Sequence, residues 1–331
     1  ATNFPDNYNT NTLNAKSEVV YAGTIPQSLA NVTYGNLTFS NGTSNAKSLV
    51  GNIQINGDLK VNAGASFNPN DYSINLFGDF TNSGNFIPGN STLTLNGVNK
   101  TIAGATTFNN LSVILGSYTV STGTITMTGD LFVENTGSLN FGNNTAILDG
   151  DLTNKGMLSS NGTATFTGTR LQTLQLLNAI SSSSTGVINF NGSVAPVINS
   201  SSSPSFATVN INNTAGITAS VPWSVFIGFN VANGATFNGG AHNHRFYGQF
   251  TNNGTVTSDG LLKFTPGAPY SASATIKLDG VSFASTGEVE FGGTAPITLL
   301  QTAPQFNIVN ITNTNAAGVT APGSWTITDQ L

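Results

Sequence analysis

The sequence predicts an all-β fold, a single elongated parallel β-solenoid (β-helix) of about 20–22 residues per coil. Three observations lead to this prediction. The segment 184–223 returns about a hundred positions later, a Gly-Asp phrase recurs at a spacing of 21 residues, and only 7% of the residues are charged. The 37 Gly and the abundant Asn suit tight turns, whereas Thr, Val, Ile and Phe favour strands.

The internal repeat is nearly identical at its strongest positions. The matched pairs, each 100 to 102 residues apart, are Gly186 and Gly287, Phe190 and Phe291, Pro196 and Pro296, Phe206 and Phe306, Asn210 and Asn310, and Trp223 and Trp325. Because one copy of such a unit cannot bury its apolar side alone, copies stack on one another. The function is therefore expected on a stacked surface rather than in one pocket.

The Gly-Asp phrase gives the length of a coil. Asp58 and Asp79 lie 21 residues apart, and so do Asp130 and Asp151. Extending this spacing predicts one column of inward-facing apolar residues, most of them 20 to 22 residues apart. The predicted column is Leu37, Leu59, Phe80, Leu111, Leu131, Leu152, Ile188, Val209, Phe229, Phe250, Val289, Val309 and Leu331.

A coil of this length suits three short strands joined by three turns. In one coil the inward-facing sets are predicted at residues 59 and 61, at Phe67, and at residues 74 and 76. Because side chains alternate along a strand, Lys60 and Asn75 are predicted to face outward. Phe132 is apolar at an outward position, so it is either a surface contact or a sign that the register is shifted there.

Three steps of the column are longer than a coil: Phe80 to Leu111, Leu152 to Ile188, and Phe250 to Val289. A Thr-Asn-x-Gly phrase precedes each of them. We expect one enlarged coil with a longer loop or hairpin at each step. Two tighter coils of about 18 residues are the alternative at the two longer steps.

The domain organisation predicted from these patterns is a cap followed by an array. A cap at residues 1–32 would cover the open edge of the first coil, which otherwise invites aggregation. No similar cap is expected at the other end, and the chain is expected to be a piece of a longer array. The array is 33–331, with blocks at about 34–107, 108–205 and 206–305 and a partial block at 306–331.

Composition excludes several classes of partner. The net charge is −5 and the nine Lys and Arg residues form no cluster, which argues against nucleic acid. No apolar run approaches the ~18 residues of a membrane span, so no membrane insertion of this segment is expected. The chain has no Cys, which excludes disulfides and thiolate metal sites. An extracellular protein of the bacterial cell surface fits this composition.

One block resembles a known group of repeats. The matching segments are Tyr34–Phe39, Asn56–Val61, Gly64–Phe67 and Gly78–Gly84. They resemble the repeats of very large cell-surface and gliding-type adhesins of Bacteroidota, which are commonly exported by the type IX secretion system. The resemblance covers most of residues 33–331 and implies an extracellular stalk or adhesin. Its motifs are turns and core positions, so it carries over no functional residue.

The Gly-Asp phrases are the first candidate for a metal site. Asp58 would stack on Asp79, and Asp130 on Asp151, and stacked carboxylates suit Ca²⁺. In the alternative interpretation, each Asp follows a turn Gly and accepts hydrogen bonds from nearby backbone amides. The second interpretation is favoured, and no metal or other cofactor is expected.

The two histidines are the second candidate. His242 and His244 would lie on the same side of a strand and could share a metal ion. His244, however, occupies the inward position that Ile74 and Ala146 hold in other coils. A structural histidine with ordinary hydrogen bonds is therefore favoured.

No catalytic residues are assigned, and the chain is not expected to be an enzyme. Polysaccharide-acting β-helix enzymes gather acidic and basic side chains on one face. Here Glu288 and Glu290 are the only close Glu pair, and they are expected to be solvated surface around inward Val289. The strip Thr124–Thr128 resembles an ice-binding array but does not recur at the coil spacing.

The predicted function is a solenoid stalk or adhesin segment that presents or mediates cell-surface attachment. The alternative is a polysaccharide-acting β-helix enzyme or a glycan-binding module. The expected partners are surface glycans or other copies of the same chain. Tyr72 and Tyr270 are candidates for stacking on sugar rings.

Overall fold

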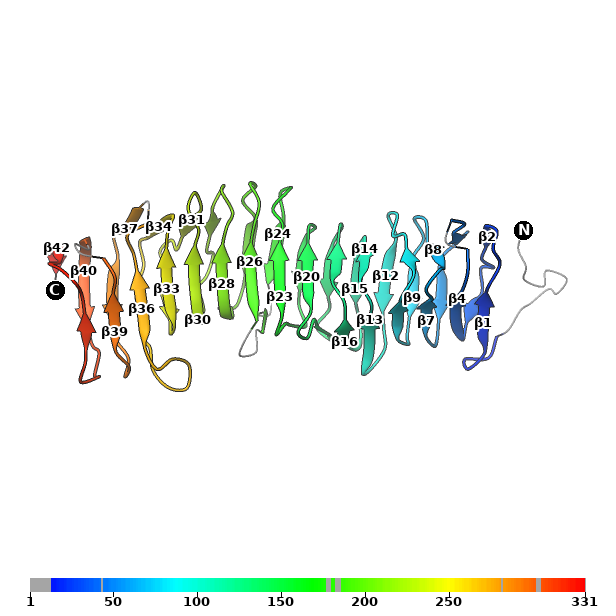
Figure 1. The fold of residues 1–331 in the computed structure, drawn as a ribbon, viewed down its shortest axis with the longest axis horizontal. Helices are drawn as coiled ribbons and strands as arrows, with labels where there is room; N and C mark the ends of the chain where they lie inside the picture. The colour runs from blue at the N-terminus through cyan, green and yellow to red at the C-terminus, as the bar shows by residue number, and fades with distance from the viewer. Residues whose placement is uncertain are drawn as a thin grey trace. The chain divides into compact units, whose positions relative to one another are not determined.

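The computed structural model describes residues 13–42, 44–176, 180–181, 186–280, 282–301 and 305–330. These residues divide into two compact units, Ala1–Ser159 and Ser160–Leu331. Each unit is built from short parallel strands stacked coil on coil, and the described residues contain no helix (Figure 1). The predicted fold class, an all-β parallel β-solenoid, is confirmed in both units. It follows that no helix of the described residues is able to cross a membrane.

The first unit has three strands per coil, one on each of three faces. The first face is β1 (Glu18–Tyr21), β4 (Asn36–Phe39), β7 (Leu59–Val61), β10 (Phe80–Asn82), β13 (Lys100–Ala103), β16 (Gly116–Thr122), β19 (Gly137–Asn140) and β22 (Met157–Ser159). The second position in the coil is held by β2 (Gln27–Ser28), β5 (Lys47–Ser48), β8 (Ser66–Asn68) and β11 (Asn85–Phe86), and then by β14 (Thr106–Phe108), β17 (Ile125–Met127) and β20 (Thr145–Leu148). The third face is β3 (Thr33–Tyr34), β6 (Ile53–Ile55), β9 (Ile74–Leu76), β12 (Thr92–Leu95), β15 (Asn110–Val113), β18 (Leu131–Val133) and β21 (Leu152–Asn154).

The second unit has a main sheet that branches. Its main path is β23 (Thr163–Phe166), β26 (Val187–Phe190), β28 (Ser205–Ile211), β30 (Ser224–Val231), β32 (His244–Phe246), β35 (Leu262–Phe264), β38 (Glu288–Phe291), β40 (Gln305–Ile311) and β42 (Thr326–Gln330). The branch from β30 is β33 (Gln249–Asn252), β36 (Ala274–Lys277), β39 (Ile297–Leu299) and β41 (Val319–Thr320). The remaining strands are β24 (Thr173–Leu176), β25 (Ile180–Ser181), β27 (Val197–Ser200), β29 (Ile217–Thr218), β31 (Thr236–Asn238), β34 (Thr255–Ser258) and β37 (Ser282–Ser285).

The inward-facing sets predicted for one coil are confirmed. Residues 59 and 61 of β7, Phe67 of β8, and residues 74 and 76 of β9 are all buried on the three faces of the same coil. Lys60, between the two buried residues of β7, is exposed. The alternation of apolar and polar residues is therefore enough to position the core of each coil.

The single predicted column is wrong, although its described members are all buried. Leu59 and Phe80 pair with each other on the first face, whereas Leu131 and Leu152 pair on the third face. Every face of a coil needs an inward apolar residue just after a turn, so a Gly-Asp-apolar phrase can begin a strand on any face. The spacing thus fixes the coil length but not the face. Leu331 lies outside the described residues.

The column also changes strands in the second unit. Phe250 of β33 pairs with Phe229, but Val289 of β38 pairs with Leu262 of β35. Val309 then follows Val289 in register. These two sets of residues lie on separate branches of the main sheet, so the step from Phe250 to Val289 combines one coil with a change of branch.

The three long steps have different origins. At the first step Phe80 pairs with Ile102, 22 residues on, so the coil there is not enlarged and the expected loop is absent from this described segment. At the third step a longer loop is confirmed, because Phe264 pairs with Phe291, 27 residues on, and residues 265–273 form the surplus. At the second step the coil contains residues 177–179 and 182–185, which lie outside the described residues.

The N-terminal segment adopts the same stacking as the coils. Strand β1 pairs in parallel with β4, and β2 with β5. The part of the predicted cap that the structure describes, residues 13–32, therefore contains strands in solenoid register. Residues 1–12 lie outside the described residues.

Strand β30 bends where the main sheet branches. Its start, Ser224 and Val225, pairs with β32, and its end, Gly228–Val231, pairs with β33. Phe226 and Ile227 lie between the two paired segments, and the side chain of Ile227 is exposed. The bend thus places consecutive apolar residues on the outside of the second unit.

The Thr-Asn-x-Gly phrases form corners that hold successive coils together. The side chain of Asn252 is fully buried, and its Nδ2 donates to the carbonyl oxygens of Leu278 and Ser282 at 3.0 and 2.9 Å. Its Oδ1 accepts a hydrogen bond from the backbone N–H of Gly254 at 3.0 Å. The phrase therefore marks a turn whose Asn joins one coil to the next.

Candidate functional site

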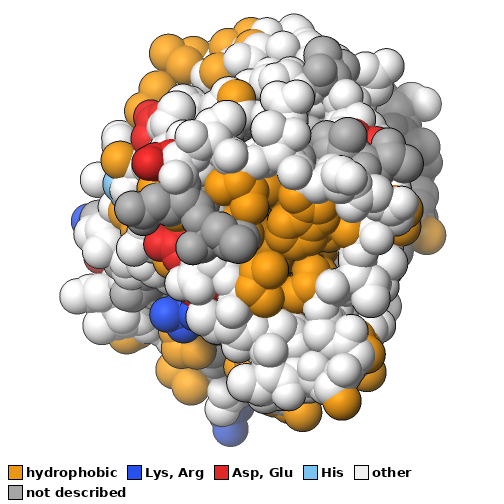
Figure 2. Space-filling view, turned by 90° about the vertical axis from the view of Figure 1, so that its left-hand side faces the viewer, with side chains coloured by type: hydrophobic (Ala, Val, Ile, Leu, Met, Phe, Trp, Pro, Cys, Tyr) orange, Lys and Arg blue, Asp and Glu red, His pale blue; other side chains and the backbone are white. Residues whose placement is uncertain are grey.

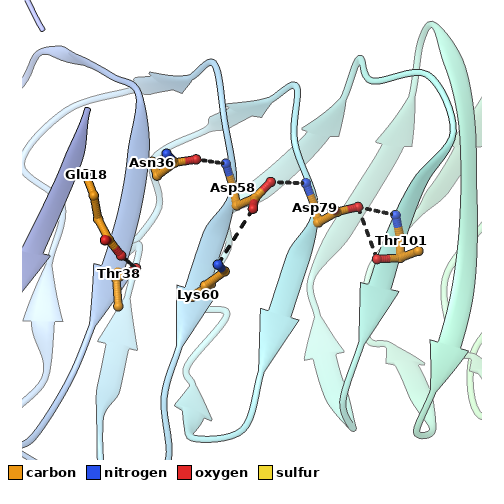
Figure 3. Close-up of polar contacts among 7 residues, drawn as sticks. All are labelled: Glu18, Asn36, Thr38, Asp58, Lys60, Asp79 and Thr101. Atoms are coloured by element: carbon orange, nitrogen blue, oxygen red, sulfur yellow. Dashed lines mark hydrogen bonds and ion pairs between the residues drawn. The ribbon is translucent and has the colours of Figure 1, made fainter. Parts of the chain in front are cut away.

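The Gly-Asp phrases form a ladder of hydrogen bonds along the first face. Asn36 Oδ1 accepts from the backbone N–H of Asp58 at 2.8 Å, and Asp58 Oδ1 accepts from that of Asp79 at 3.0 Å (Figure 3). Asp79 Oδ1 in turn accepts from the N–H and hydroxyl of Thr101 at 2.7 and 3.1 Å. The structural interpretation is confirmed here, with the addition that each carboxylate bonds the coil that follows its own.

The same arrangement occurs on the third face. Asn110 Oδ1 accepts from the N–H of Asp130 at 2.8 Å, and Asp130 Oδ1 accepts from that of Asp151 at 2.9 Å. In the part of the chain that the structure describes, no three His, Asp or Glu side chains gather closely enough to hold a metal ion. The ladders serve to connect coils.

In the second unit, asparagine side chains on the outward side of the strands bond one another. Asn210 Nδ2 donates to Asn189 Oδ1, and Asn230 Nδ2 donates to Asn210 Oδ1, each at 2.8 Å. These three residues are paired in register on the outward side of β26, β28 and β30. An amide can donate and accept at once, so a stack of identical Asn side chains is self-complementary.

His244 is fully buried and has a structural role. Its Nδ1 accepts from the backbone N–H of Trp223 at 3.1 Å, and its Nε2 lies 2.9 Å from the carbonyl oxygen of Gly239. These partners define the neutral ring with the proton on Nε2, which donates to Gly239. Burial lowers the pKa of His244, and the nearby His242 adds to this, against the hydrogen bond to Gly239. The structural interpretation of His244 is confirmed.

Acid is expected to destabilise the second unit through His244. The unfolded side chain has the ordinary histidine pKa of 6.5, while the folded one has a lower pKa and stays neutral to lower pH. Below pH 6.5 the unfolded state binds an extra proton. The unfolding free energy therefore decreases as the pH is lowered, by at most about 1.4 kcal/mol per pH unit. Urea denaturation at pH 7 and pH 5 measures this.

Two variants control the acid experiment. The His244→Gln variant is expected to lose most of the difference between the two pH values. The His242→Gln variant is expected to keep most of it, since burial is the first cause of the lowered pKa of His244. Equal pH dependence in the wild type and the His244→Gln variant would contradict the assignment.

Glu290 is not the solvated residue that the sequence predicts. Its side chain is almost fully buried, and its Oε1 accepts from Lys263 Nζ and from the Thr312 hydroxyl, each at 2.6 Å. Burial alone would raise the pKa of Glu290, but the bonds from Lys263 and Thr312 and the charges of Lys263 and Arg245 outweigh it and lower the pKa. The expectation failed because Lys263 and Glu290 are paired in register across a 27-residue coil. Glu288 is half-buried.

Phe132 is a surface contact, as one of the two interpretations predicted. Lys155 Nζ lies over its ring, 4.9 Å from the centroid. Residues Leu131 and Val133 on either side are buried, so the register is correct at this strand. The contact joins neighbouring coils through a cation–π interaction.

The threonine strip does not continue along the stack. Thr126 of β17 pairs with Thr107 in one neighbouring coil but with Ile147 in the other. A flat threonine array would need Thr at this place in successive coils, and the predicted lack of recurrence is confirmed at this strand.

Three outward-facing rings of the second unit form a cluster, named here the aromatic cluster: Phe226, Tyr247 and Tyr270. The ring of Tyr270 stacks on Phe226 with centroids 4.4 Å apart and an interplanar angle of 26°. Tyr247 lies 5.1 Å from Phe226 and 5.0 Å from Tyr270. Tyr270 remains 49% exposed. No other described group of outward-facing rings has three members in mutual contact.

The aromatic cluster lies beside a depression of about 220 Å³. The depression is lined by the loop residues Ala268, Pro269, Tyr270, Ser271 and Ala272. These belong to the surplus segment 265–273, which projects past the strand ends beside β36 (Figure 1).

Of the aromatic cluster, only Tyr270 is predicted from sequence. Tyr72, the other tyrosine predicted to stack on sugar rings, is 37% exposed in the first unit. Phe226 and Tyr247 are not among the predicted residues. The available signal for Phe226 was the repeat, because the matching position in the later copy is occupied by Thr328.

The last described coil leaves part of its apolar core uncovered. Figure 2 looks onto the end of the second unit that carries β40 and β42, where hydrophobic side chains gather at the centre. Ile311 is 50% exposed, whereas its repeat partner Ile211 is 0% exposed. Trp325 is half-buried and its partner Trp223 is buried. A residue of this core is therefore fully covered only between two coils.

Comparison of the chain with known protein families, with curated proteins and with solved structures finds no match.

Proposed function

We propose that this chain is an extracellular structural element of a bacterial cell surface, a solenoid stalk or adhesin segment that presents or mediates attachment. One observation carries the proposal. Outward-facing polar side chains, which in an enzyme would converge on a substrate, are used here to bond one coil to the next, as in Asn36–Asp58–Asp79. Such a surface strengthens the stack along its length.

The mechanical part of the proposal follows from the contacts. Each coil is connected to its neighbours by parallel strand pairing, by Asx ladders and by buried corners such as Asn252. In a stack of this kind, stability is approximately a sum of neighbouring interfaces. An element that only has to hold and transmit a load needs nothing more.

The location and export route belong to the same proposal. The absence of Cys, the few charges and the Asn- and Thr-rich surface support an extracellular location. The resemblance to surface adhesin repeats of Bacteroidota supports the cell surface and, with it, type IX secretion. On this proposal the chain has no catalytic activity, and its partners are surface glycans or copies of itself.

A force experiment tests the stalk. The full chain, held by both ends in an optical trap, is expected to lengthen in steps of one coil. About 20 residues leave the stack at each step, which adds about 7 nm of extended chain. The Asp79→Ala variant, which removes the bonds to Thr101, is expected to lower the force of the neighbouring steps, and the Lys60→Ala variant is not.

Two results would overturn the proposal. One is a single low-force transition that releases a whole unit, because a load-bearing stack must yield coil by coil. The other is release of soluble products from a panel of polysaccharides incubated with the chain, since that would make it an enzyme.

A further inference from the structure

The aromatic cluster is not needed to build a coil. In the matching position of the repeat Phe226 is replaced by Thr328, and both copies keep the tryptophan three residues earlier. Phe226 of β30 and Tyr247, which follows β32, are half-buried, whereas the core rings Phe229 and Phe246 are buried. The core would be complete without the cluster, so its rings require another explanation.

The surplus loop positions Tyr270 over this outward surface. The coil from Phe264 to Phe291 is longer than the 20 to 22 residues typical of the chain, and the segment 265–273 contains the excess. The backbone N–H groups of Tyr270 and Ser271 both donate to the carbonyl oxygen of Gly267 at 3.0 Å. This turn fixes the loop at the place where the Tyr270 ring meets Phe226.

The geometry of the aromatic cluster leaves one broad aromatic surface. The Tyr270 ring stacks on Phe226, and the residue remains 49% exposed. The rings are stacked or tilted side by side and do not surround a central space, as they would around an ammonium group. A flat ligand fits such a surface better than a compact cation.

Hydrogen-bonding groups border the rings. Tyr247 and Tyr270 contribute hydroxyls, and Arg245, two residues before Tyr247, is exposed. Ser271 lines the depression beside Tyr270. Three of these four groups are neutral hydroxyls, so the surface suits a ligand rich in hydroxyl groups.

We propose that the aromatic cluster binds a neutral glycan, with one pyranose ring stacked on Tyr270. A pyranose whose hydroxyls are all equatorial presents a face of C–H groups to the electron-rich face of an aromatic ring. Its hydroxyls point outward, toward the bordering donors and acceptors. A β-linked glucan presents such rings in a flat chain. The inference deepens the adhesive part of the proposed function and rests on it.

Binding of short glucans to the full chain tests the inference. Saturation-transfer NMR and calorimetry are to be run with cellohexaose as the β-linked probe and maltohexaose as the α-linked probe. Cellohexaose is expected to bind, and the Tyr270→Ala variant is expected to weaken its binding at least about tenfold, the effect of 1.4 kcal/mol. Maltohexaose, whose chain is curved, is expected to bind more weakly.

Matched variants separate stacking from folding. The Phe226→Thr variant installs the residue that the repeat already tolerates, so it keeps the coil and is expected to weaken cellohexaose binding. The Tyr270→Phe variant keeps the ring and is expected to retain most of the binding. The Tyr72→Ala variant, which removes an exposed ring from the first unit, is expected to leave binding unchanged. Unchanged thermal unfolding confirms that each variant is folded.

Three results would overturn the inference. They are no binding of either probe to the wild type, equal losses in the Tyr72→Ala and Tyr270→Ala variants, and equal affinity for the two probes. The force experiment does not depend on the aromatic cluster. If the chain unfolds coil by coil under force but binds neither glucan, the glycan site is refuted and the proposed stalk function is not.

Discussion

Replacing Trp223 by Ala is expected to lower the unfolding free energy of the second unit by about 3–5 kcal/mol. The side chain is 1% exposed and its ring contacts Phe206 and Phe237 at centroid distances of 5.2 and 5.3 Å. Its Nε1 is buried without a hydrogen-bond partner among the described residues. The Ala variant removes this unsatisfied donor, which offsets a part of the lost unfolding free energy. Denaturation followed by circular dichroism measures the change.

The repeat supplies a matched control for this prediction. The Trp325→Ala variant changes the equivalent residue in the last described coil, where the ring is only half-buried. Its effect is expected to be less than half as large, because less apolar surface becomes exposed. If both substitutions had the same effect, covering by a neighbouring coil would not be what stabilises this position.

Replacing Asn252 by Ala is expected to lower the unfolding free energy by about 3 kcal/mol. The substitution removes the donor to the carbonyl oxygens of buried Leu278 and exposed Ser282, and Gly254 loses the acceptor for its N–H. Hydrogen exchange is expected to rise first in residues 274–285, which the corner ties to the preceding coil.

The neighbouring residue is the control for the corner. Asn253 is exposed, and its Oδ1 accepts a hydrogen bond from Lys277. The Asn253→Ala variant is therefore expected to change the unfolding free energy by less than about 1 kcal/mol. An Asn252→Ala variant no less stable than Asn253→Ala would show that the buried amide contributes little.

The strands, turns and length of a coil could be predicted because they depend on residues that are close together in the sequence. The alternation around Lys60 and the 21-residue spacing of Asp58 and Asp79 were enough to identify the strands, the turns and the coil length. The face on which each strand lies was not predictable from the same phrase, because the three faces present equivalent requirements. Leu131 was for this reason assigned to the column of Leu59.

The features that sequence missed depend on pairing between distant residues. Glu290 is buried because register places it beside Lys263 and because Thr312 comes from the following coil. The aromatic cluster depends on the bend at Phe226 and on the length of the loop that carries Tyr270. Neither arrangement is encoded in a contiguous motif, so each became evident only once the coils were stacked.

Stacking in register favours neutral side chains in the outward row of β26, β28 and β30. Stacking brings equivalent positions of neighbouring coils about 4.8 Å apart. Two like charges at that distance repel by about 1 kcal/mol in water and by about 3–4 kcal/mol at the lower dielectric near a protein surface. Asn189, Asn210 and Asn230 occupy such a row with neutral amides that attract one another. Hydrogen bonds between neutral amides hold the coils together at such a row, so its contribution to the unfolding free energy should hardly change with salt concentration.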